Sequence, residues 1–516
     1  MVDADLRSRI TVESFPRLTE RYSVLETHIS LVFLTESHVY KTKKPVQFPF
    51  LDYSTLEKRL EACHEEIRVN RRLAPHIYVR VVPIVQHDSI VKFGGDGHVI
   101  DYAVEMRRLP DEQLLDHRIA AGSACVADIS RLLDLLVPFY DQHPCDENMR
   151  SCASFESVWK AANENIQTMA PLSPPEYAGL LSRIRSSQLQ YLHWEREQFT
   201  SRMNSREIIE GHGDLRPEHI CMTEPPVVFD AVEFSQEFRT ADVVSELAFL
   251  AMELDFLDVH ELGRELLKQY QNRTKKQFPM HLLSFYQAYR ATVRAKVHLL
   301  QTTPGRDDAD LHRALFHRYL HLAAAYASDF HHPVIVMMIG LSGVGKSTIA
   351  RELCFRWGAE WMRTDQVRQE LSERRDPDAP FGQGIYGMEM TTKTYREAVH
   401  RTEQLLRAGI SVVLDGTFLD PSHRDMVYSI GKDVACNVLT VWCDCPESIA
   451  RERIAERTQK QTDISDARLE TYEKQRASFD SSALMTDPQV VRVDSSRPIQ
   501  EVVEAIRSAI RQRVRH

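Results

Sequence analysis

Short apolar runs alternate with amphipathic stretches over the last third of the chain. The runs are VIVMMIG, EWMRT, SVVLD, VLTVWC and VVRVD, and segments with a helical period separate them. Runs that are apolar at nearly every position predict strands buried on both faces, as in a parallel sheet covered by helices. The pattern begins abruptly after residues 331–333, so we expect a domain boundary near residue 330.

The pattern before residue 330 is different. Strand-like stretches (SLVFL, HVYK, IYVRVVPIV and HVIDYAVEM) surround a helical stretch over residues 55–73, and mostly helical sequence follows from about residue 123. Short strands bracket HGDLRPEHI (residues 212–220), and helices are expected over residues 240–330. The sequence therefore predicts an α+β domain at 1–330, with a small β-rich lobe and a large helical lobe, and an α/β domain at 331–516.

The composition is that of a globular protein, and the length suggests two or three domains. The 516 residues are 43% hydrophobic and 27% charged, and no apolar run is long enough to span a bilayer. No signal peptide is visible, and the nine scattered cysteines form no CxxC pair, so we expect a cytoplasmic protein with no membrane contact. The formal net charge of −10 disfavours nucleic acid as a partner without excluding it.

One motif gives a strong chemical signal. GLSGVGKS, residues 340–347, matches GxxxxGK[ST] and lies between an apolar run and a helical stretch. Its glycines let backbone amides surround phosphates, Lys346 reaches the β- and γ-phosphates, and the Ser347 hydroxyl binds Mg²⁺. We therefore expect ATP and Mg²⁺ as cofactors. The expected contacts are Gly340, Ser342, Gly343, Val344, Gly345, Lys346, Ser347 and Thr348.

Polar residues follow two of the predicted strands at the edge of the sheet where nucleotides bind. Asp365, after the second strand, is placed to accept the proton of an attacking hydroxyl. Arg368, about one helical turn further on, is placed to hold an anionic acceptor. Asp415 ends SVVLD and is the candidate acid that orients Mg²⁺.

Arginines further along the chain are candidates for binding the acceptor and the transferred group. Arg424 follows PSH, and Arg453 and Arg457 lie four residues apart in PESIARERIAER. The last two are placed to clamp the phosphoryl group from a lid. A solvated helix with Glu–Arg pairs accounts for them equally well.

GLSGVGKS, RTDQVR, VVLDGTF and CPESIARERIAER together resemble the small P-loop kinases of the polynucleotide kinase, gluconate kinase and zeta-toxin type. The resemblance covers about residues 330–516. It implies that Asp365 is the base, that Arg368 contacts the acceptor, and that Arg453 and Arg457 belong to a lid. It leaves the acceptor open, because this group phosphorylates sugars, nucleotides and nucleic-acid ends.

A second set of residues lies in the first 330. HGDLRPEHI resembles the catalytic loop HxDxxxxN of aminoglycoside phosphotransferases and choline kinases, which implies that Asp214 takes the acceptor's proton. VVFDAVEF then supplies the metal-binding acid, Asp230. Upstream, Lys41 resembles the lysine of the kinase strand, and Glu66 would be its ion-pair partner. This order is that of a bilobal, protein-kinase-like fold.

Two departures from that pattern concern the metal and the phosphates. His219 stands where the pattern has Asn, and it would be a softer ligand for Mg²⁺ than oxygen. No Gly-rich loop is visible, only the short turn at residues 35–38.

Nearly the whole chain resembles bacterial bifunctional aminoglycoside phosphotransferase/ATP-binding proteins, through stretches such as VYKTKKPV, FLDYSTLEKRLEACHEEIRVNRRLAP and YRATVRAKV.

The expected function is that of an ATP-dependent kinase, a phosphotransferase with an alcohol group as acceptor. The C-terminal site would transfer the γ-phosphoryl group to a small hydroxylated molecule, and the kinase-like domain would be active or inactive. Two alternatives stay open: an ATP-binding or ATP-hydrolysing regulatory protein with a pseudokinase sensor domain, and a kinase of nucleic-acid 5′-hydroxyl ends.

Overall fold

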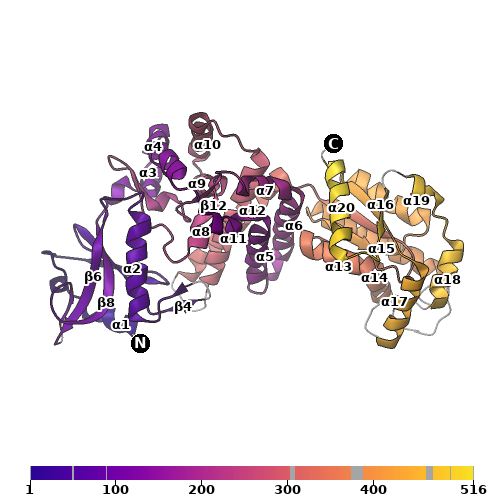
Figure 1. Ribbon diagram of the computed structural model, residues 1–516, viewed down its shortest axis with the longest axis horizontal. Coiled ribbons are helices and arrows are strands. Elements are labelled where there is room, and N and C mark those ends of the chain that lie inside the picture. The colour runs from indigo at the N-terminus through magenta and orange to yellow at the C-terminus, as the bar shows by residue number, and fades with distance from the viewer. Residues whose placement is uncertain are drawn as a thin grey trace. The chain divides into compact units, whose positions relative to one another are not determined.

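The computed structural model describes residues 2–48, 51–88, 90–302, 308–372, 387–460, 469–487 and 490–514 (Figure 1). The chain forms two compact units. The first comprises Met1–Val158 and Glu197–Ala291, and the second comprises Trp159–Arg196 and Thr292–His516. Residue 330 therefore lies inside the second unit, and a boundary between sequence domains at that position stays a prediction.

The first unit begins with a six-stranded antiparallel sheet, in the order β1-β2-β3-β8-β6-β7. The strands are β1 (Ser23–Glu26), β2 (Ser30–Leu34), β3 (His38–Lys43), β6 (Tyr78–His87), β7 (Ile90–Phe93) and β8 (His98–Arg107). Helix α1 (Val2–Arg9) packs on one face, and α2 (Leu56–Asn70) packs on the other. Because side chains alternate along a strand, Tyr40 enters the α1 face while Lys41 and Lys43 face α2.

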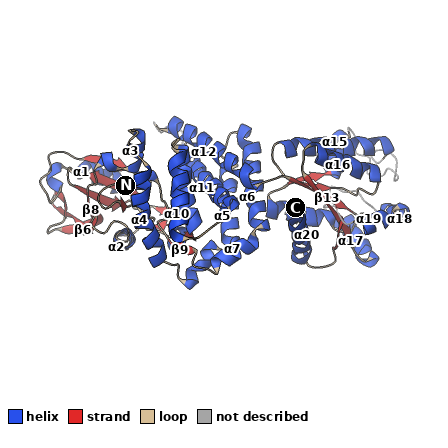
Figure 2. Ribbon diagram, turned by 90° about the horizontal axis from the view of Figure 1, so that it is seen from above, coloured by secondary structure: helices blue, strands red, loops and turns tan. Residues whose placement is uncertain are grey.

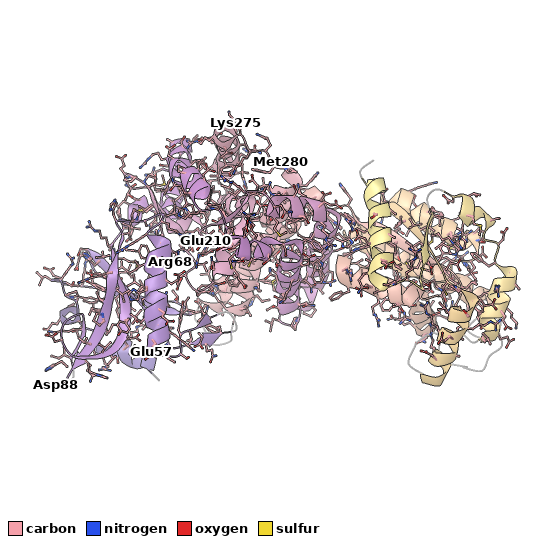
Figure 3. The ribbon with its side chains drawn as sticks, viewed as in Figure 1. Glu57, Arg68, Asp88, Glu210, Lys275 and Met280 are labelled. Carbon is pink, nitrogen blue, oxygen red and sulfur yellow. The ribbon has the colours of Figure 1, made fainter. Side chains whose placement is uncertain are left out.

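Helices form most of the remainder of the first unit, as the sequence predicts. They are α3 (Leu115–Ala120), α4 (Val126–Gln142), α7 (Arg196–Met203), α8 (Gln236–Arg239), α9 (Val243–Phe256) and α10 (His260–Thr274), while α5 (Phe155–Met169) and α11 (Met280–Leu300) continue into the second unit. Short strands pair β9 (Ile208–Glu210) with β12 (Thr240–Asp242), β10 (Ile220–Cys221) with β11 (Val227–Val228), and β4 (Gln47–Phe48) with β5 (Leu51–Asp52). The Arg68 guanidinium on α2 lies 3.6 Å from the Glu210 carboxylate on β9, which ties the two elements together (Figure 3).

The second unit contains a five-stranded parallel sheet in the order β14-β15-β13-β16-β17. The strands are β13 (Val334–Ile339), β14 (Glu360–Arg363), β15 (Val412–Asp415), β16 (Asn437–Asp444) and β17 (Val490–Asp494). All five match the apolar runs of the sequence, so the predicted parallel sheet is confirmed. Figure 2 shows helices on either side of these strands.

Two hydrophobic cores explain the continuous apolar runs. On one face of the sheet, Val334, Val336 and Met338 pack with α13 (Lys346–Trp357) and α20 (Ile499–Val514). On the other face, Ile335, Met337 and Ile339 pack with α15 (Met388–Arg407) and α16 (Pro421–Asp433). Every residue of β13 is therefore buried. The remaining helices after the sheet begins are α14 (Thr364–Leu371), α17 (Glu447–Lys460), α18 (Leu469–Ser478) and α19 (Ser482–Thr486).

Helices from earlier in the chain complete the second unit. They are α6 (Ala178–Trp194), α12 (Ala309–Phe330) and parts of α5 and α11. Trp194 joins the core beneath β13, and the Trp159 indole donates to the Arg356 carbonyl at 2.8 Å. The Ser411 hydroxyl at the start of β15 donates to the Gln190 side chain of α6 at 3.1 Å. The end of the parallel sheet at which β15 begins therefore packs against buried polar residues of α6.

Candidate functional site

The P-loop connects β13 to α13 and has a glycine-dependent conformation. Gly343 and Gly345 have φ angles of 82° and 91°, in the left-handed region that favours glycine. A Cβ at position 343 would lie 2.7 Å from an Ile454 side-chain carbon and 3.0 Å from the Ala450 carbonyl oxygen. The glycine spacing of the motif is thus required by both backbone angle and space.

Lys346 and two acids gather at the carboxyl ends of the strands. Lys346 begins α13, and its ammonium donates to the Leu341 carbonyl at 2.8 Å. Burial lowers the pKa of Lys346, and Asp415 and Asp365 act against this shift. Burial raises the pKa of Asp415, while Lys346 and a hydrogen bond with Ser347 lower it. Lys346, Ser347, Asp365 and Asp415, which the sequence assigned to one site, therefore lie close together.

The arrangement fits Mg²⁺. Asp415 ends β15 with only 5% of its surface exposed, and the Ser347 side chain lies close enough to lower its pKa, so the two residues can offer oxygen ligands to one metal ion. Mg²⁺ prefers such oxygen ligands, and in P-loop proteins it completes its shell with water and phosphate oxygens. Ser347 and Asp415 are therefore the residues that would hold the metal.

Trp361 and Arg363 also belong to this site, although the motifs did not single them out. The Trp361 indole N–H donates to Asp415 Oδ2 at 3.2 Å. The Arg363 guanidinium lies 4.6 Å from the centre of the Trp361 ring, and its Nε lies 4.0 Å from Asp415 Oδ2. Both side chains come from β14, which pairs with β15 so that Arg363 stands opposite Asp415. Alternation along EWMR places Trp361 and Arg363 on one face, which is the signal that sequence reasoning missed.

The predicted acceptor side is built from α14, α15 and α16. Arg368 is buried, and its guanidinium donates to the Asp365 carboxylate at 2.7 Å. Arg424 is also buried and donates to the carbonyls of Phe418 and Leu419 at 2.8 and 2.9 Å, so it holds the turn after β15. Tyr395 of α15 lies close enough to Asp365 and Arg368 to interact electrostatically with both.

The two arginines of α17 have different surroundings. Arg453 donates to the Val344 carbonyl at 3.4 Å and to the Ser495 carbonyl at 2.9 Å, so it contacts the outside of the P-loop. Arg457 lies close enough to Lys346 to lower its pKa. Their predicted roles in clamping the transferred group stay predictions.

The first unit contains a buried cluster of opposite charges. Lys41 Nζ lies 2.9 Å from Glu66 Oε1 and 2.5 Å from Asp230 Oδ1. Lys43 Nζ lies 2.6 Å from Glu66 Oε2 and also pairs with Glu233. The ion pair expected between Lys41 and Glu66 is therefore present. Lys43 pairs with the same glutamate because it lies two residues after Lys41 and its side chain therefore points to the same face of the strand.

Asp214 and His219 lie close to this cluster. His219 Nδ1–H donates to the Asp214 carbonyl at 2.9 Å, and Nε2 accepts from Arg216 at 3.4 Å and lies 3.8 Å from Asp230 Oδ2. Arg216 also donates to the Asp214 carboxylate at 2.8 Å. Among the described residues, no group of three or more His, Cys, Asp or Glu could hold a metal ion. His219 and Asp230, which were predicted as metal ligands, lie near each other but belong to no larger group of such ligands among the described residues.

The loop that carries Asp214 is held by buried groups. The amides of His212 and Gly213 donate to the Glu246 carboxylate at 3.1 and 2.8 Å. His212 Nε2–H donates to the Phe229 carbonyl at 2.8 Å, and Nδ1 accepts from the Asp214 amide at 3.3 Å. Burial lowers the pKa of His212 to about 4, which agrees with a neutral ring in both contacts.

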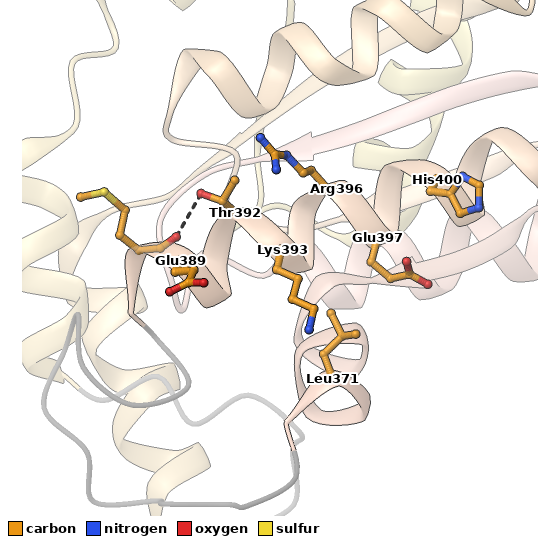
Figure 4. A pocket seen from close by; sticks show the side chains of 8 residues that line it. Leu371, Glu389, Thr392, Lys393, Arg396, Glu397 and His400 are labelled. Atoms are coloured by element: carbon orange, nitrogen blue, oxygen red, sulfur yellow. Dashed lines mark hydrogen bonds between the residues drawn. The ribbon is translucent and has the colours of Figure 1, made fainter.

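A separate groove lies between α14 and the start of α15 (Figure 4). Its lining is Leu371, Met388, Glu389, Thr392, Lys393, Arg396, Glu397 and His400. None of the predicted site residues contributes to it, so it lies outside the nucleotide site.

Within the ranges that the structure describes, no helix is long and apolar enough to cross a bilayer.

The parallel sheet and its helices form a P-loop nucleotide-binding domain, because β13, the glycine loop and α13 follow one another and the buried Asp415 lies on the neighbouring strand. Residues 335–482 match the model of a family described as AAA domain. The match covers the P-loop, Asp365, Asp415 and the arginines of α17.

Several known proteins are similar to parts or most of this chain, and three of them illustrate the range. An uncharacterized protein of Mycobacterium tuberculosis is 29% identical over 465 residues, which cover 88% of this chain and 90% of that protein. The uridylate kinase of Saccharomyces cerevisiae is 25% identical over 191 residues, 34% of this chain and 90% of the kinase. A gluconokinase structure from Sinorhizobium meliloti, 18% identical, covers 36% of this chain and 94% of its own, with a TM-score of 0.26.

Proposed function

We propose that the P-loop site transfers the γ-phosphoryl group of ATP to a hydroxyl group of a small acceptor. One observation carries the proposal: Asp365 lies in the first turn of α14, two residues after Arg363, which stands opposite Asp415, and it is paired with Arg368 at 2.7 Å. A carboxylate beside the phosphate-binding lysine is placed to accept the proton of an attacking hydroxyl. A site that only bound nucleotide would have no need of it.

Each residue of the P-loop site has a separate role in the proposed transfer. Backbone amides of the P-loop and Lys346 bind the phosphates, and Ser347 and Asp415 hold Mg²⁺, which neutralises charge on the phosphate oxygens. Asp365 takes the acceptor's proton, and Arg368 both orients Asp365 and presents a cation to the acceptor. Arg457 adds positive charge near the transferred group. Catalysis then comes from positioning and electrostatics, as in other phosphoryl transfers.

The uridylate kinase that resembles this region supports phosphoryl transfer to a small molecule, and its name suggests a nucleotide as the acceptor there. The buried Arg368 favours an acceptor that carries an anionic group as well as the reacting hydroxyl. No feature of the described residues favours a nucleic-acid end over such a small acid.

The test is transfer of radiolabelled γ-phosphate from ATP to sugars, sugar acids, nucleosides, nucleotides, aminoglycosides and 5′-hydroxyl oligonucleotides. An Asp365→Asn variant should lose transfer by about 10²- to 10⁴-fold, the usual contribution of a general base, while binding ATP as the wild type does. Transfer that is unchanged in this variant would reject the assigned base. An Asp214→Ala variant should keep the same product.

A second candidate concerns the first unit, which we infer to be a kinase-like domain that binds a ligand without transferring phosphate. Lys41 neutralises Asp230 at 2.5 Å, and His219 is tied to Asp214 and Arg216, so the position of the second metal ligand is occupied by a hydrogen-bonded imidazole. The protein would then be a P-loop kinase with a pseudokinase sensor. Product formation that survives Lys346→Ala and disappears in Asp214→Ala would contradict this assignment.

A further inference from the structure

Helix α17 supports the outside of the P-loop with one face. Ala450, Arg453 and Ile454 lie three and four residues apart, so they share that face. Ile454 and the Ala450 carbonyl enclose Gly343, and Arg453 Nη1 lies 3.0 Å from where a Cβ of Gly345 would be. The loop is therefore packed against this helix at Gly343 and at Gly345.

The Val344 carbonyl is the polar group of the loop that faces α17. It accepts hydrogen bonds from Arg453 Nη1, at 3.4 Å, and from the Ser495 hydroxyl. The two donors are joined to each other, because Arg453 Nη2 donates to the Ser495 carbonyl at 2.9 Å. Ser495 follows β17, and its amide donates to the Asp444 carbonyl at the end of β16 at 2.9 Å. The position of these donors is thus fixed by the sheet itself.

The orientation of one peptide bond follows from these contacts. In a trans peptide the C=O of one residue and the N–H of the next point in opposite directions. Because the Val344 C=O points at Arg453 and Ser495, the Gly345 N–H points away from them. Gly345 directly precedes α13, where backbone N–H groups and the helix dipole bind phosphate. A peptide turned the other way would present a carbonyl oxygen to the phosphates and repel them.

We propose that Arg453 and Ser495 are positioning residues that fix the peptide between Val344 and Gly345 in its phosphate-binding orientation. The proposal rests on the proposed function of the P-loop site, but it assigns Arg453 to the loop rather than to the transferred phosphoryl group. Ser495 acquires a role that no sequence motif indicated. Both act through the Gly345 N–H, which serves the phosphates common to ATP and ADP.

The first experiment needs no nucleotide. Amide hydrogen exchange is measured on the ligand-free full chain for peptides covering residues 340–348, in wild type, Arg453→Ala, Ser495→Ala and Ser495→Thr. We expect faster exchange in both alanine variants and wild-type exchange in Ser495→Thr, which keeps the hydroxyl. Arg451→Ala is the matched control, because Arg451 lies on the same helix but pairs with Glu447 and Glu473. Unchanged exchange in Ser495→Ala and Arg453→Ala would overturn the proposal.

The second experiment compares nucleotides on the same proteins. Loss of one oriented amide should weaken MgATP and MgADP equally, by about tenfold, which equals about 1.4 kcal/mol. A loss confined to ATP in Arg453→Ala would mean that Arg453 touches the γ-phosphate, and it would overturn the positioning role. Faster loop exchange in the two alanine variants, together with a wild type that binds no nucleotide, would support the loop role and refute the proposed function. Equal thermal midpoints of Ser495→Ala and Ser495→Thr exclude general unfolding as the cause.

Discussion

Replacing Trp361 by Phe removes the indole N–H that holds Asp415 and leaves an aromatic ring of similar shape. Burial raises the pKa of Asp415, so the protonated carboxyl competes with the carboxylate that would hold Mg²⁺. The indole N–H, 3.2 Å from Oδ2, favours the carboxylate. A hydrogen bond to a charged group contributes about 1.5–3 kcal/mol, and this long one belongs at the lower end. A loss of about 1.5 kcal/mol corresponds to about tenfold in the ionised fraction at acid pH.

The assay is calorimetric titration of Mg²⁺ into protein saturated with a non-hydrolysable ATP analogue, repeated at several pH values. In the wild type, affinity should fall as the pH decreases, because protonation removes the metal-binding form of Asp415. In Trp361→Phe we expect about tenfold weaker affinity at the acid end and convergence with the wild type at high pH. Trp159→Phe, which removes an indole hydrogen bond elsewhere in the same unit, is the matched control. Parallel pH profiles of Trp361→Phe and wild type would refute this reasoning.

Three further predictions follow from buried groups. Glu66→Gln leaves the ammoniums of Lys41 and Lys43 with one acid fewer inside the first unit, so we expect about 3–5 kcal/mol lower stability by urea unfolding. The exposed Glu61→Gln on the same helix should cost less than about 1 kcal/mol, and equal effects would contradict the cluster's role. The pKa of His212 lies near 4 in the folded protein and near 6.5 when unfolded, so its contribution, on the order of 3 kcal/mol, is present above pH 6.5 and is lost as the pH falls toward 4. His212→Gln should therefore show a shallower fall of the thermal midpoint over that range, and an identical slope would exclude His212 as a source. Gly343→Ala forces a Cβ against Ile454 at a φ of 82°, so we expect more than about 1 kcal/mol of destabilisation and loss of nucleotide affinity, whereas wild-type binding would show that the loop adapts.

The parallel sheet was predictable because both of its faces are buried. The central strand β13 is buried at every position, which makes its run VIVMMI visible without any alignment. The P-loop was predictable because its glycines, lysine and serine are adjacent in sequence. Lys41 and Glu66 were paired correctly through the order of a kinase-like pattern, and the structure brings their charges to 2.9 Å.

The rest depends on contacts between distant segments. Trp361 meets Asp415 only because β14 pairs with β15 in one register, and Ser495 meets Val344 only after β17 joins the sheet. The packing of α6 against the parallel sheet has no local signal either, because its buried Ser186 and Gln190 look like surface residues in the sequence. Arg453 and Arg457 share a helical face, but packing against the P-loop gives them different neighbours.

If the P-loop and Lys346 bind the phosphates of MgATP, calorimetric titration of MgATP into the full chain will detect it. We expect magnesium-dependent binding in the wild type and in Asp214→Ala that is absent in Lys346→Ala, with all three proteins equally folded. Binding that persists unchanged in Lys346→Ala, or a wild type that shows none, would rule out this nucleotide site.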